Sequence, residues 1–262
     1  MIETHYHLLF DTDDGPKSIE ESLQLAEASI GEGVTHIVCT PHANTKYAFD
    51  PDRNNRRLEE LRQHLGNRIA LGIGCDFHLS DENIENFSRN PLQYTINRGQ
   101  YLLIELSDFG ISQTVTAVLE RLIGSGFIPI VTHPERNSTI ISAPSRLIEW
   151  IRCGCLVQIT AGSLTGRFGK AAEACALQLL KQQRVHLIAS DAHSIDRRPP
   201  ALKVAFDRVA QSFGLDTAEY LCVRNPAAVF KGEPISAKVE KSKPAHQRST
   251  KMTSKFSWMP WR

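Results

Sequence analysis

The opening stretch of the sequence, MIETHYH, contains two histidines one residue apart, and similar metal-capable side chains recur along the chain. If residues 2–7 form a strand, the imidazoles of His5 and His7 point to the same face. Most later strand-like runs also end in a histidine or a carboxylate. The complete set of candidate metal ligands is His5, His7, Asp14, His42, Asp76, Glu105, His133, Asp191 and His193.

This set predicts a metal centre if its members converge. Carboxylates gathered in one place repel one another and are costly to bury without a counter-charge, which divalent cations supply. Mixed imidazole and carboxylate ligands suit Mn, Fe, Zn or Co better than Ca or Mg. The set is larger than one ion needs, so we expect two or three ions. The alternative for His5 and His7 is a partly exposed edge strand with two ordinary histidines.

Two arginines lie close to these candidates in the sequence. Arg136 belongs to HPER, three residues after His133, and Arg198 belongs to DAHSIDRRPP, five residues after His193. A guanidinium group matches phosphate oxygens in a two-pronged manner, so we expect both arginines to bind phosphate. The alternative is a pair of surface arginines that neutralise nearby acids. Glu135 is either a partner of the site or a proton-transfer group, and both interpretations stay open.

The remaining histidines do not end strand-like runs in this way. We interpret them as structural or solvent-exposed: His36, His64, His78, His186 and His246. The six cysteines form no C-x-x-C pair and lie mostly in apolar runs, which indicates free thiols in a reducing cytoplasm. None of them has arginine six positions later, as a cysteine-dependent phosphatase would need, so a thiolate mechanism is disfavoured.

The elements that must position these residues alternate between strands and helices. The predicted strands are residues 2–7, 35–40, 69–76, 101–106, 128–133, 155–160 and 185–190. The predicted helices start after a capping box at Ser18 and Glu21, span 52–65, 145–153, 169–182 and 199–212, and include the apolar stripe from Val115 to Ile123. This alternation predicts a parallel sheet covered by helices, either open or closed into a barrel. In a barrel, the carboxyl ends of the strands carry the chemistry.

Length and charge predict one large domain followed by a tail. Residues 231–262 carry eight Lys and Arg against two acids, which leaves residues 1–230 with a balance of −5. The tail, residues 231–262, is expected to be disordered, as a solubilising end or a basic interaction arm. The acidic body does not suggest nucleic-acid binding. No signal peptide and no apolar run of about 20 residues is visible, so we expect a cytoplasmic protein without membrane insertion.

The motifs H-x-H, DDGPKS, PH, IEL, THPER and ASDAH, followed by RRPP and NPAAVF, resemble the polymerase and histidinol phosphatase (PHP) superfamily. Within it, residues 1–230 are similar to the bacterial manganese-dependent protein-tyrosine phosphatases of capsule and exopolysaccharide systems. The resemblance implies a distorted seven-stranded TIM-like (β/α) barrel with a trinuclear site, in which the nine candidates are ligands and the two arginines bind phosphate. Asp76 departs from this pattern, because the resembling proteins usually have glutamate there.

From these residues we expect a metal-dependent protein-tyrosine phosphatase that hydrolyses phosphotyrosine with a metal-activated hydroxide, with manganese as the first choice of metal. The resemblance implies that the substrate is the tail of a tyrosine kinase controlling polysaccharide synthesis. One alternative is a histidinol-phosphatase-like enzyme acting on small phosphomonoesters. Another is a non-catalytic regulatory binding protein of the polysaccharide machinery. The sequence does not predict the oligomeric state.

Overall fold

A computed structural model of the chain describes residues 1–107 and 110–235, and its strands are all parallel. The strands are β1 (Ile2–Tyr6), β2 (His36–Cys39), β3 (His42–Ala43), β4 (Ala70–Ile73), β5 (Asp76–His78), β6 (Tyr101–Glu105), β7 (Ile128–Thr132), β8 (Leu156–Thr160) and β9 (Leu187–Ala189). They form a three-stranded sheet in the order β1-β2-β4 and a six-stranded sheet in the order β3-β5-β6-β7-β8-β9. The chain is therefore an α/β fold with parallel sheets.

Two predicted strands are interrupted in the structure, which is why there are two sheets instead of the single seven-stranded sheet expected. The run 35–40 ends at Cys39, and the chain passes Pro41, which has no N–H for a ladder, before β3 begins. The run 69–76 breaks at residues 74–75 between β4 and β5. Backbone hydrogen bonds nevertheless cross the break, from Gly74 N–H to the Cys39 carbonyl at 2.9 Å and from Asp76 N–H to the Pro41 carbonyl at 3.1 Å.

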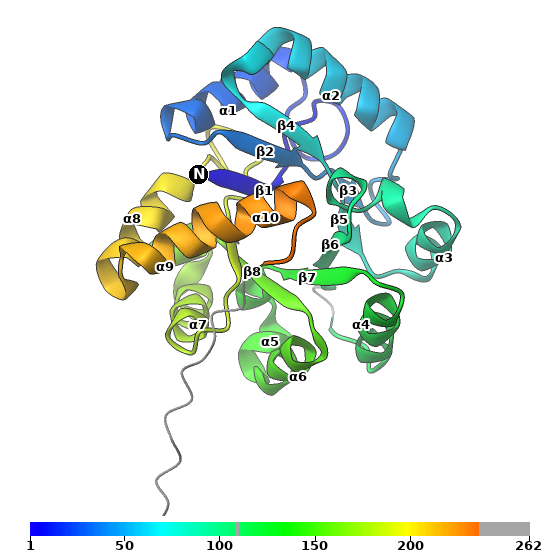
Figure 1. The fold of residues 1–262 in the computed structure, drawn as a ribbon, viewed down its shortest axis with the longest axis vertical. Coiled ribbons are helices and arrows are strands. Elements are labelled where there is room, and N and C mark those ends of the chain that lie inside the picture. The colour runs from blue at the N-terminus through cyan, green and yellow to red at the C-terminus, as the bar shows by residue number, and fades with distance from the viewer. Residues whose placement is uncertain (108–109, 236–262) are drawn as a thin grey trace, which may run out of the picture.

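Figure 1 shows most helices around the outside of the strands, whereas the last helix lies across the middle of this view, next to β1. The helices are α1 (Ile19–Gly31), α2 (Pro51–Leu65), α3 (Asp81–Arg89), α4 (Thr114–Gly124), α5 (Ser138–Ser142), α6 (Ser145–Cys153), α7 (Gly169–Lys181), α8 (Leu202–Phe213), α9 (Leu215–Glu219) and α10 (Asn225–Lys231). The predicted cap of α1 is present, because the Ser18 side chain accepts from the N–H of Glu21. The short helices α3, α5, α9 and α10 were not predicted from the sequence.

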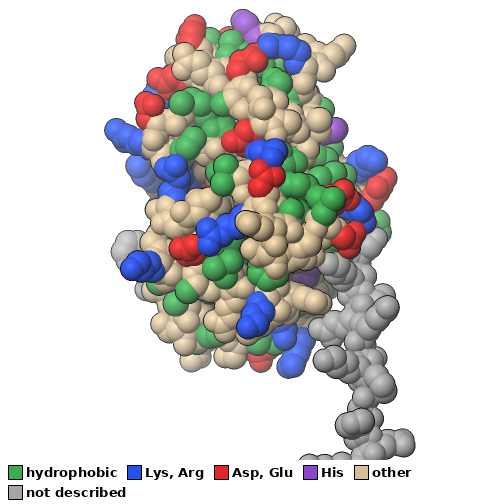
Figure 2. Space-filling view, turned by 90° about the vertical axis from the view of Figure 1, so that its left-hand side faces the viewer, with side chains coloured by type: hydrophobic (Ala, Val, Ile, Leu, Met, Phe, Trp, Pro, Cys, Tyr) green, Lys and Arg blue, Asp and Glu red, His purple; other side chains and the backbone are tan. Residues whose placement is uncertain are grey.

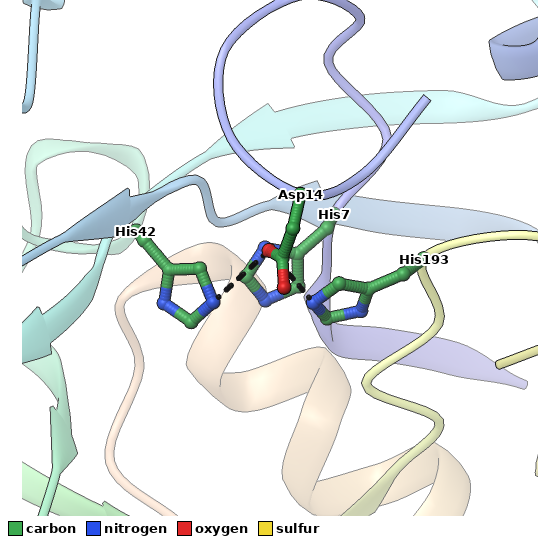
Figure 3. Close-up of side chains that lie close together, drawn as sticks. All are labelled: His7, Asp14, His42 and His193. Carbon is green, nitrogen blue, oxygen red and sulfur yellow. Dashed lines mark ion pairs between the residues drawn. The ribbon is translucent and has the colours of Figure 1, made fainter. Parts of the chain in front are cut away.

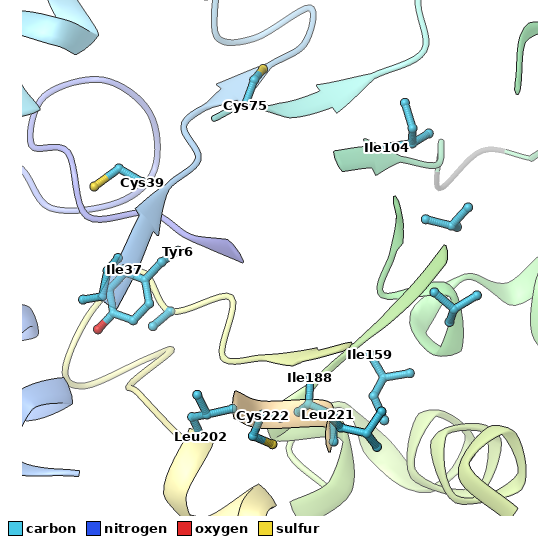
Figure 4. Packing of buried hydrophobic residues seen from close by; sticks show 14 of the residues in the cluster. Tyr6, Ile37, Cys39, Cys75, Ile104, Ile159, Ile188, Leu202, Leu221 and Cys222 are labelled. Atoms are coloured by element: carbon cyan, nitrogen blue, oxygen red, sulfur yellow. The ribbon is translucent and has the colours of Figure 1, made fainter. Parts of the chain in front are cut away.

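Side chains of the strands alternate between an inner and an outer core. Leu103, Ile130 and Leu156 are aligned on β6, β7 and β8 and belong to the small inner core, which Val229 of α10 covers. The large outer core fills the space between strands and helices, and Figure 4 shows part of it. Tyr6 belongs to this outer core, with its hydroxyl 2.7 Å from the Ser29 hydroxyl on α1.

The first and last strands meet at their carboxyl ends. The N–H of His7 donates to the Ala192 carbonyl at 3.0 Å, and the N–H of Asp191 donates to the His5 carbonyl at 3.1 Å. These bonds join the segment after β1 to the segment after β9. The candidate ligands at both ends of the chain are therefore brought to one place.

The surface of the protein carries charges of both signs. On the face shown in Figure 2, Lys and Arg side chains are interspersed with Asp and Glu side chains. Within the described residues, no helix is both long and apolar enough to span a bilayer.

The predicted tail begins at 231, but the Glu233 carbonyl still accepts from the Tyr101 hydroxyl at 2.7 Å, and Ile235 packs on the inner core. Residues 236–262, including His246, lie outside the described residues.

Candidate metal centre

Seven of the nine candidate ligands lie at the carboxyl end of a strand or in the segment that follows it; the exceptions are His42 and Asp76. The ladder register aligns His42 of β3 with Asp76 of β5, and Asp76 with the inner-core residue Leu103 of β6. Since aligned residues of a parallel sheet share a face, the imidazole of His42 and the carboxylate of Asp76 both point inward. His42 and Asp76 open short strands of their own, whereas the sequence suggested that they end longer ones.

All nine candidates fall into four overlapping groups, and within each group the potential ligand atoms lie within 4.8 Å of one another. The groups are His7, Asp14, His42 and His193; His5, His7 and Asp76; His5, His133 and Asp191; and His42, Asp76 and Glu105. His5, His7, His42 and Asp76 each belong to two groups. The structure therefore brings the whole predicted set together into one connected cluster.

His5 and His7 face each other at the middle of this cluster. Their Nε2 atoms are 3.3 Å apart, and both side chains are buried. The other ring nitrogen of each is engaged elsewhere: Nδ1 of His7 lies 2.7 Å from Asp13 Oδ2, and Nδ1 of His5 lies 3.0 Å from the Gln158 side-chain amide. Both Nε2 atoms are therefore directed at the space between the rings, which excludes the exposed edge-strand interpretation.

Asp14 lies across the mouth of the cluster, between His42 and His193 (Figure 3). One carboxylate oxygen is 3.4 Å from Nε2 of each ring. Partial burial opposes ionisation of Asp14, but hydrogen bonds to His193 and His42 outweigh it and move the pKa of the carboxyl group far below its usual range. Asp14 is therefore an anion at neutral pH.

Asp76 provides the test of whether the cluster fits cations. Its side chain is buried, and neither carboxylate oxygen has a hydrogen-bond partner within the described part of the chain. Oδ2 lies only 3.3 Å from His5 Nε2 and 3.2 Å from His42 Nδ1. A buried carboxylate without hydrogen bonds is costly. Cations that join these oxygens to the facing ring nitrogens would remove that cost, so the donor set fits divalent metal ions.

The surroundings shift the pKa values of His42 and His193 in opposite directions. Burial opposes protonation of His42, but Asp14, Asp76 and Glu105 outweigh it and raise its pKa far above the usual value. In contrast, burial and the neighbouring His7 lower the pKa of His193 to about 4. Protonation of His42 and binding of a cation both compensate the carboxylates, so metal binding should displace protons and weaken in acid.

Two candidate ligands have a left-handed backbone. His133, directly after β7, has φ 34°, and Asp191, two residues after β9, has φ 53°. Side chains other than glycine rarely adopt this conformation, and it is concentrated at functional sites. The turn at His133 also starts the 3₁₀ turn η4 (Pro134–Arg136), which carries the first of the two predicted phosphate-binding arginines.

Both arginines reach the cluster through Asp191. Nη1 of Arg136 lies 2.5 Å from Asp191 Oδ2, and Nη2 of Arg198 contacts the same oxygen. Nη1 of Arg198 also lies 3.0 Å from His193 Nε2. Two guanidinium groups from different loops therefore converge at one edge of the candidate metal centre.

With this geometry established, we compared the chain with known proteins. Residues 1–231 match the family described as Capsular polysaccharide synthesis, CpsB/CapC. The chain belongs to this family. CapC of Staphylococcus aureus is 37% identical over 246 residues, which cover 91% of this chain and 94% of CapC. The tyrosine-protein phosphatase CpsB of Streptococcus pneumoniae is 30% identical over 244 residues, which cover 90% of this chain and all of CpsB.

A solved structure of the CpsB/CapC family has the same fold. It is described as one of YwqE from Bacillus subtilis and CpsB from Streptococcus pneumoniae, unique metal-dependent tyrosine phosphatases. The TM-score is 0.84 at 28% identity, covering 90% of this chain and 96% of the other. The resemblance to tyrosine phosphatases of capsule systems, which the sequence motifs predicted, is confirmed.

Around the cluster of this CpsB/CapC chain lie residues that the sequence analysis missed. Asp13 accepts from the N–H of Gly15 and His42 as well as contacting His7, and its pKa is about 2, because His7 outweighs the effect of burial. Gln158 lies between Thr4 and His5. The signal for Asp13 was its position inside DDGPKS. Gln158 gave no signal, because its strand reads as an apolar core strand.

Glu135 is placed outside the cluster. Its buried carboxylate accepts from the Thr160 N–H at 2.8 Å and from the Ser163 hydroxyl at 2.7 Å. It therefore holds the 3₁₀ turn η5 (Ala161–Thr165) against η4, and burial raises its pKa. Of the two interpretations left open, the structure favours that of a partner that orders nearby loops.

The other described histidines are not members of the ligand groups. Nδ1 of His186 accepts from the Val157 N–H at 3.0 Å, and burial lowers the pKa of His186 to about 4. His64 is exposed on α2, and the ring of His36 packs edge-on against Phe230. His78 lies at the end of β5, partly buried.

Proposed function

We propose that the chain is a metal-dependent protein-tyrosine phosphatase of capsule or exopolysaccharide synthesis. The single observation that carries this proposal is the buried Asp76 carboxylate, unpaired by hydrogen bonds and enclosed by the ring nitrogens of His5 and His42. The named activity of CpsB, and the described activity of the YwqE and CpsB structure, support the same reaction.

The nine clustered side chains are the ligands in this proposal, and they hold two or three divalent ions, with manganese preferred over Fe, Zn or Co. When bound by these side chains, such ions would supply Lewis-acid chemistry, lowering the pKa of water and offsetting negative charge on phosphoryl oxygens. Asp13 keeps the Nε2 atom of His7 directed at the site, through the contact with Nδ1. Gln158 does the same for His5.

Arg136 and Arg198 bind the phosphoryl oxygens. Both guanidinium groups lie against Asp191, a proposed ligand, so each has a donor directed at the edge of the cluster where a phosphate would sit. Their fixed positive charges stabilise the charge spread over the phosphoryl oxygens in the transition state. The tyrosyl leaving group has a pKa near 10, so it requires less protonation than an alkyl alcohol would.

The same proposal covers the domain, the substrate protein and the cellular location. Residues 1–230 form the phosphatase domain, and the hydrogen bonds across the two strand breaks support a distorted seven-stranded barrel that the two sheets build together. The substrate is a phosphotyrosine protein, in our proposal the tail of a bacterial tyrosine kinase. The six free cysteines support a reducing, cytoplasmic location.

A direct comparison of substrates tests this function. The purified full chain, loaded with manganese, is offered a phosphotyrosyl peptide and histidinol phosphate side by side, and its metal content is measured. We expect filled metal sites and a higher kcat/KM for the phosphotyrosyl peptide. A preference for histidinol phosphate would favour the small-molecule phosphatase, and filled sites without turnover of either substrate would contradict catalysis.

A further inference from the structure

A cavity of about 410 Å³ opens beside the candidate metal centre, and neither the ligands nor the phosphate contacts explain it. Its lining includes Glu105, His133 and Arg136 of the proposed site, and also Ile141, Phe168 and Ala172. The last three side chains, which are apolar, come from α5, the loop before α7 and α7 itself. We call this cavity the side slot.

Arg136 contacts both the metal centre and an apolar side chain of the side slot. On one side its Nη1 lies 2.5 Å from Asp191 at the metal centre, and on the other its Cζ lies 4.3 Å from the centre of the Phe168 ring. A phosphoryl group bound by Arg136 at the metal centre therefore has the side slot next to it. The group esterified to that phosphate would then lie next to the apolar side chains of the slot.

The loop that carries Phe168 is built to place the ring there. Gly162 leaves the necessary space, because a Cβ atom at this position would lie only 3.0 Å from Phe168 Cε2. The flanking Gly166 and Gly169 have φ of 76° and 87°, a conformation that favours glycine. Arg167 donates to the Arg197 carbonyl at 3.0 Å, so the loop is tied to the segment that carries Arg198.

The chemistry of the slot suits a flat apolar ring. Phe168 provides an aromatic ring, and Ile141 and the small side chains Ala171 and Ala172 line the same cavity. Aromatic rings gain from such contacts beyond the area that they bury, and a guanidinium over a ring adds a cation–π attraction. An alkyl phosphate as short as phosphoserine has no group that would fill this space.

We propose that the side slot binds the phenyl ring of phosphotyrosine and that Phe168 is a residue that determines specificity for aryl over alkyl phosphates. This inference rests on the proposed function and names its recognition element. Phe168 contacts the ring of the substrate, while Arg136 contacts its phosphate. The side slot and Arg136 together therefore bind the phenyl ring and the phosphate of the same phosphotyrosine.

Binding of two probes to the manganese-loaded full chain tests the proposal without turnover. Inorganic phosphate occupies only the phosphate position, whereas phenylphosphonate adds a ring. By titration calorimetry, we expect Phe168→Ala to weaken phenylphosphonate about fivefold and phosphate less than twofold. Phe168→Tyr should retain the affinity for phenylphosphonate. The matched control is Phe127→Ala, a partly buried phenylalanine in a different cavity, which should change neither affinity.

The outcomes are distinct. An equal loss for both probes would show that Phe168 acts only by positioning Arg136, and an unchanged affinity for phenylphosphonate would show that the ring does not bind there; either overturns the proposal. If Phe168→Ala does not fold, as judged by circular dichroism and metal content, Phe168→Leu carries the same comparison. Absence of phosphotyrosine hydrolysis by the wild-type protein would contradict the proposed function instead, since the binding comparison needs no turnover.

Discussion

At the scale of single residues, the metal centre depends on how each imidazole is held. His7 has Asp13 on one ring nitrogen and the cluster on the other, and it is buried. Burial opposes its protonation, but Asp13 outweighs burial and raises the pKa of His7 to about 9. The same carboxylate that favours the proton also fixes which nitrogen is free to bind a metal.

The first prediction concerns His7 itself. His7→Ala removes a proposed ligand but little apolar packing, so the protein should stay folded by circular dichroism. It should lose part of its metal, and turnover of an aryl phosphate should fall roughly a hundredfold or more. His64→Ala, at an exposed position of α2, is the control and should change neither quantity. Full metal content with near-normal turnover in His7→Ala would remove this histidine from the site.

The second prediction concerns Asp13, which holds the imidazole ring of His7. Asp13→Asn keeps the shape of the side chain but removes the negative charge next to His7 Nδ1. Loss of such a partner typically weakens metal affinity by about 10- to 100-fold, and we expect a loss of that size. Competition with a chelator, followed by elemental analysis, measures it. An affinity equal to that of the wild type would mean that the contact with Asp13 only orders the loop.

At the scale of elements, the interruption between β4 and β5 decides where Asp76 lies. The side chain of Asn97 holds β4 in place. It accepts a hydrogen bond from the Ile73 N–H at 3.0 Å and donates one to the Phe230 carbonyl at 2.7 Å. This one amide connects β4 to the segment before β6 and to α10. The chain can therefore turn at residues 74–75 and start β5 with Asp76 facing inward.

The third prediction tests this connection. A Cβ atom on Gly72 would lie 2.5 Å from Asn97 Oδ1 and 2.9 Å from the Phe230 ring. Gly72→Ala should therefore displace Asn97 and lower the free energy of unfolding by about 1–3 kcal/mol, measured by urea denaturation. In Gly124→Ala, at the end of α4, the new Cβ has no neighbour within 4 Å among the described residues, so stability should hardly change. Equal stability of both variants would show that Asn97 is easily displaced.

The fourth prediction concerns His186, next to β9, and the dependence of stability on pH. Because burial lowers its folded-state pKa to about 4 from an ordinary value of 6.5, the unfolded chain binds a proton in this range and the folded chain does not. The contribution of His186 to stability is complete above pH 6.5 and is lost as the pH falls towards 4. The loss is at most about 3 kcal/mol. His186→Gln should flatten this part of the stability profile, and an unchanged profile would assign the acid sensitivity to other groups.

At the scale of the whole molecule, the described chain ends on the side of the strands opposite the metal centre. Ile235 packs on the inner core near α10, whereas the candidate ligands are at the carboxyl ends of the strands. The candidate metal centre and Ile235, the last described residue, are therefore at different ends of the described part of the molecule.

The fifth prediction follows from this separation. A chain that ends at Ile235 should hydrolyse a small aryl phosphate at a rate similar to that of the full chain. Ending at Lys231 removes the partner of the Tyr101 hydroxyl and the packing of Ile235, so this shorter chain should unfold at lower temperature. A tenfold or larger loss of turnover in a folded chain ending at Ile235 would mean that residues 236–262 contribute to the site.

The sequence by itself determined the types and order of the functional residues. Burying polar side chains at the ends of apolar runs costs free energy unless they bind something together, such as a metal ion. The nine candidates could therefore be named from the chain alone. The family could be recognised because DDGPKS, and ASDAH with the downstream RPP, resemble its motifs. The helices with clear apolar periodicity, such as α2, α6 and α7, were also predicted close to their observed bounds.

Only the tertiary structure decided how these residues act on one another. Whether Asp13 or Asp14 contacts a given imidazole depends on the path of a loop, and the contact between Gln158 and His5 joins residues 153 positions apart. Pro41 marks the break before β3 in the sequence, but no local pattern marks the break at residues 74–75 before β5. The side slot likewise exists because η4, α5 and α7 meet, and no pattern along the chain specifies the space that they leave between them.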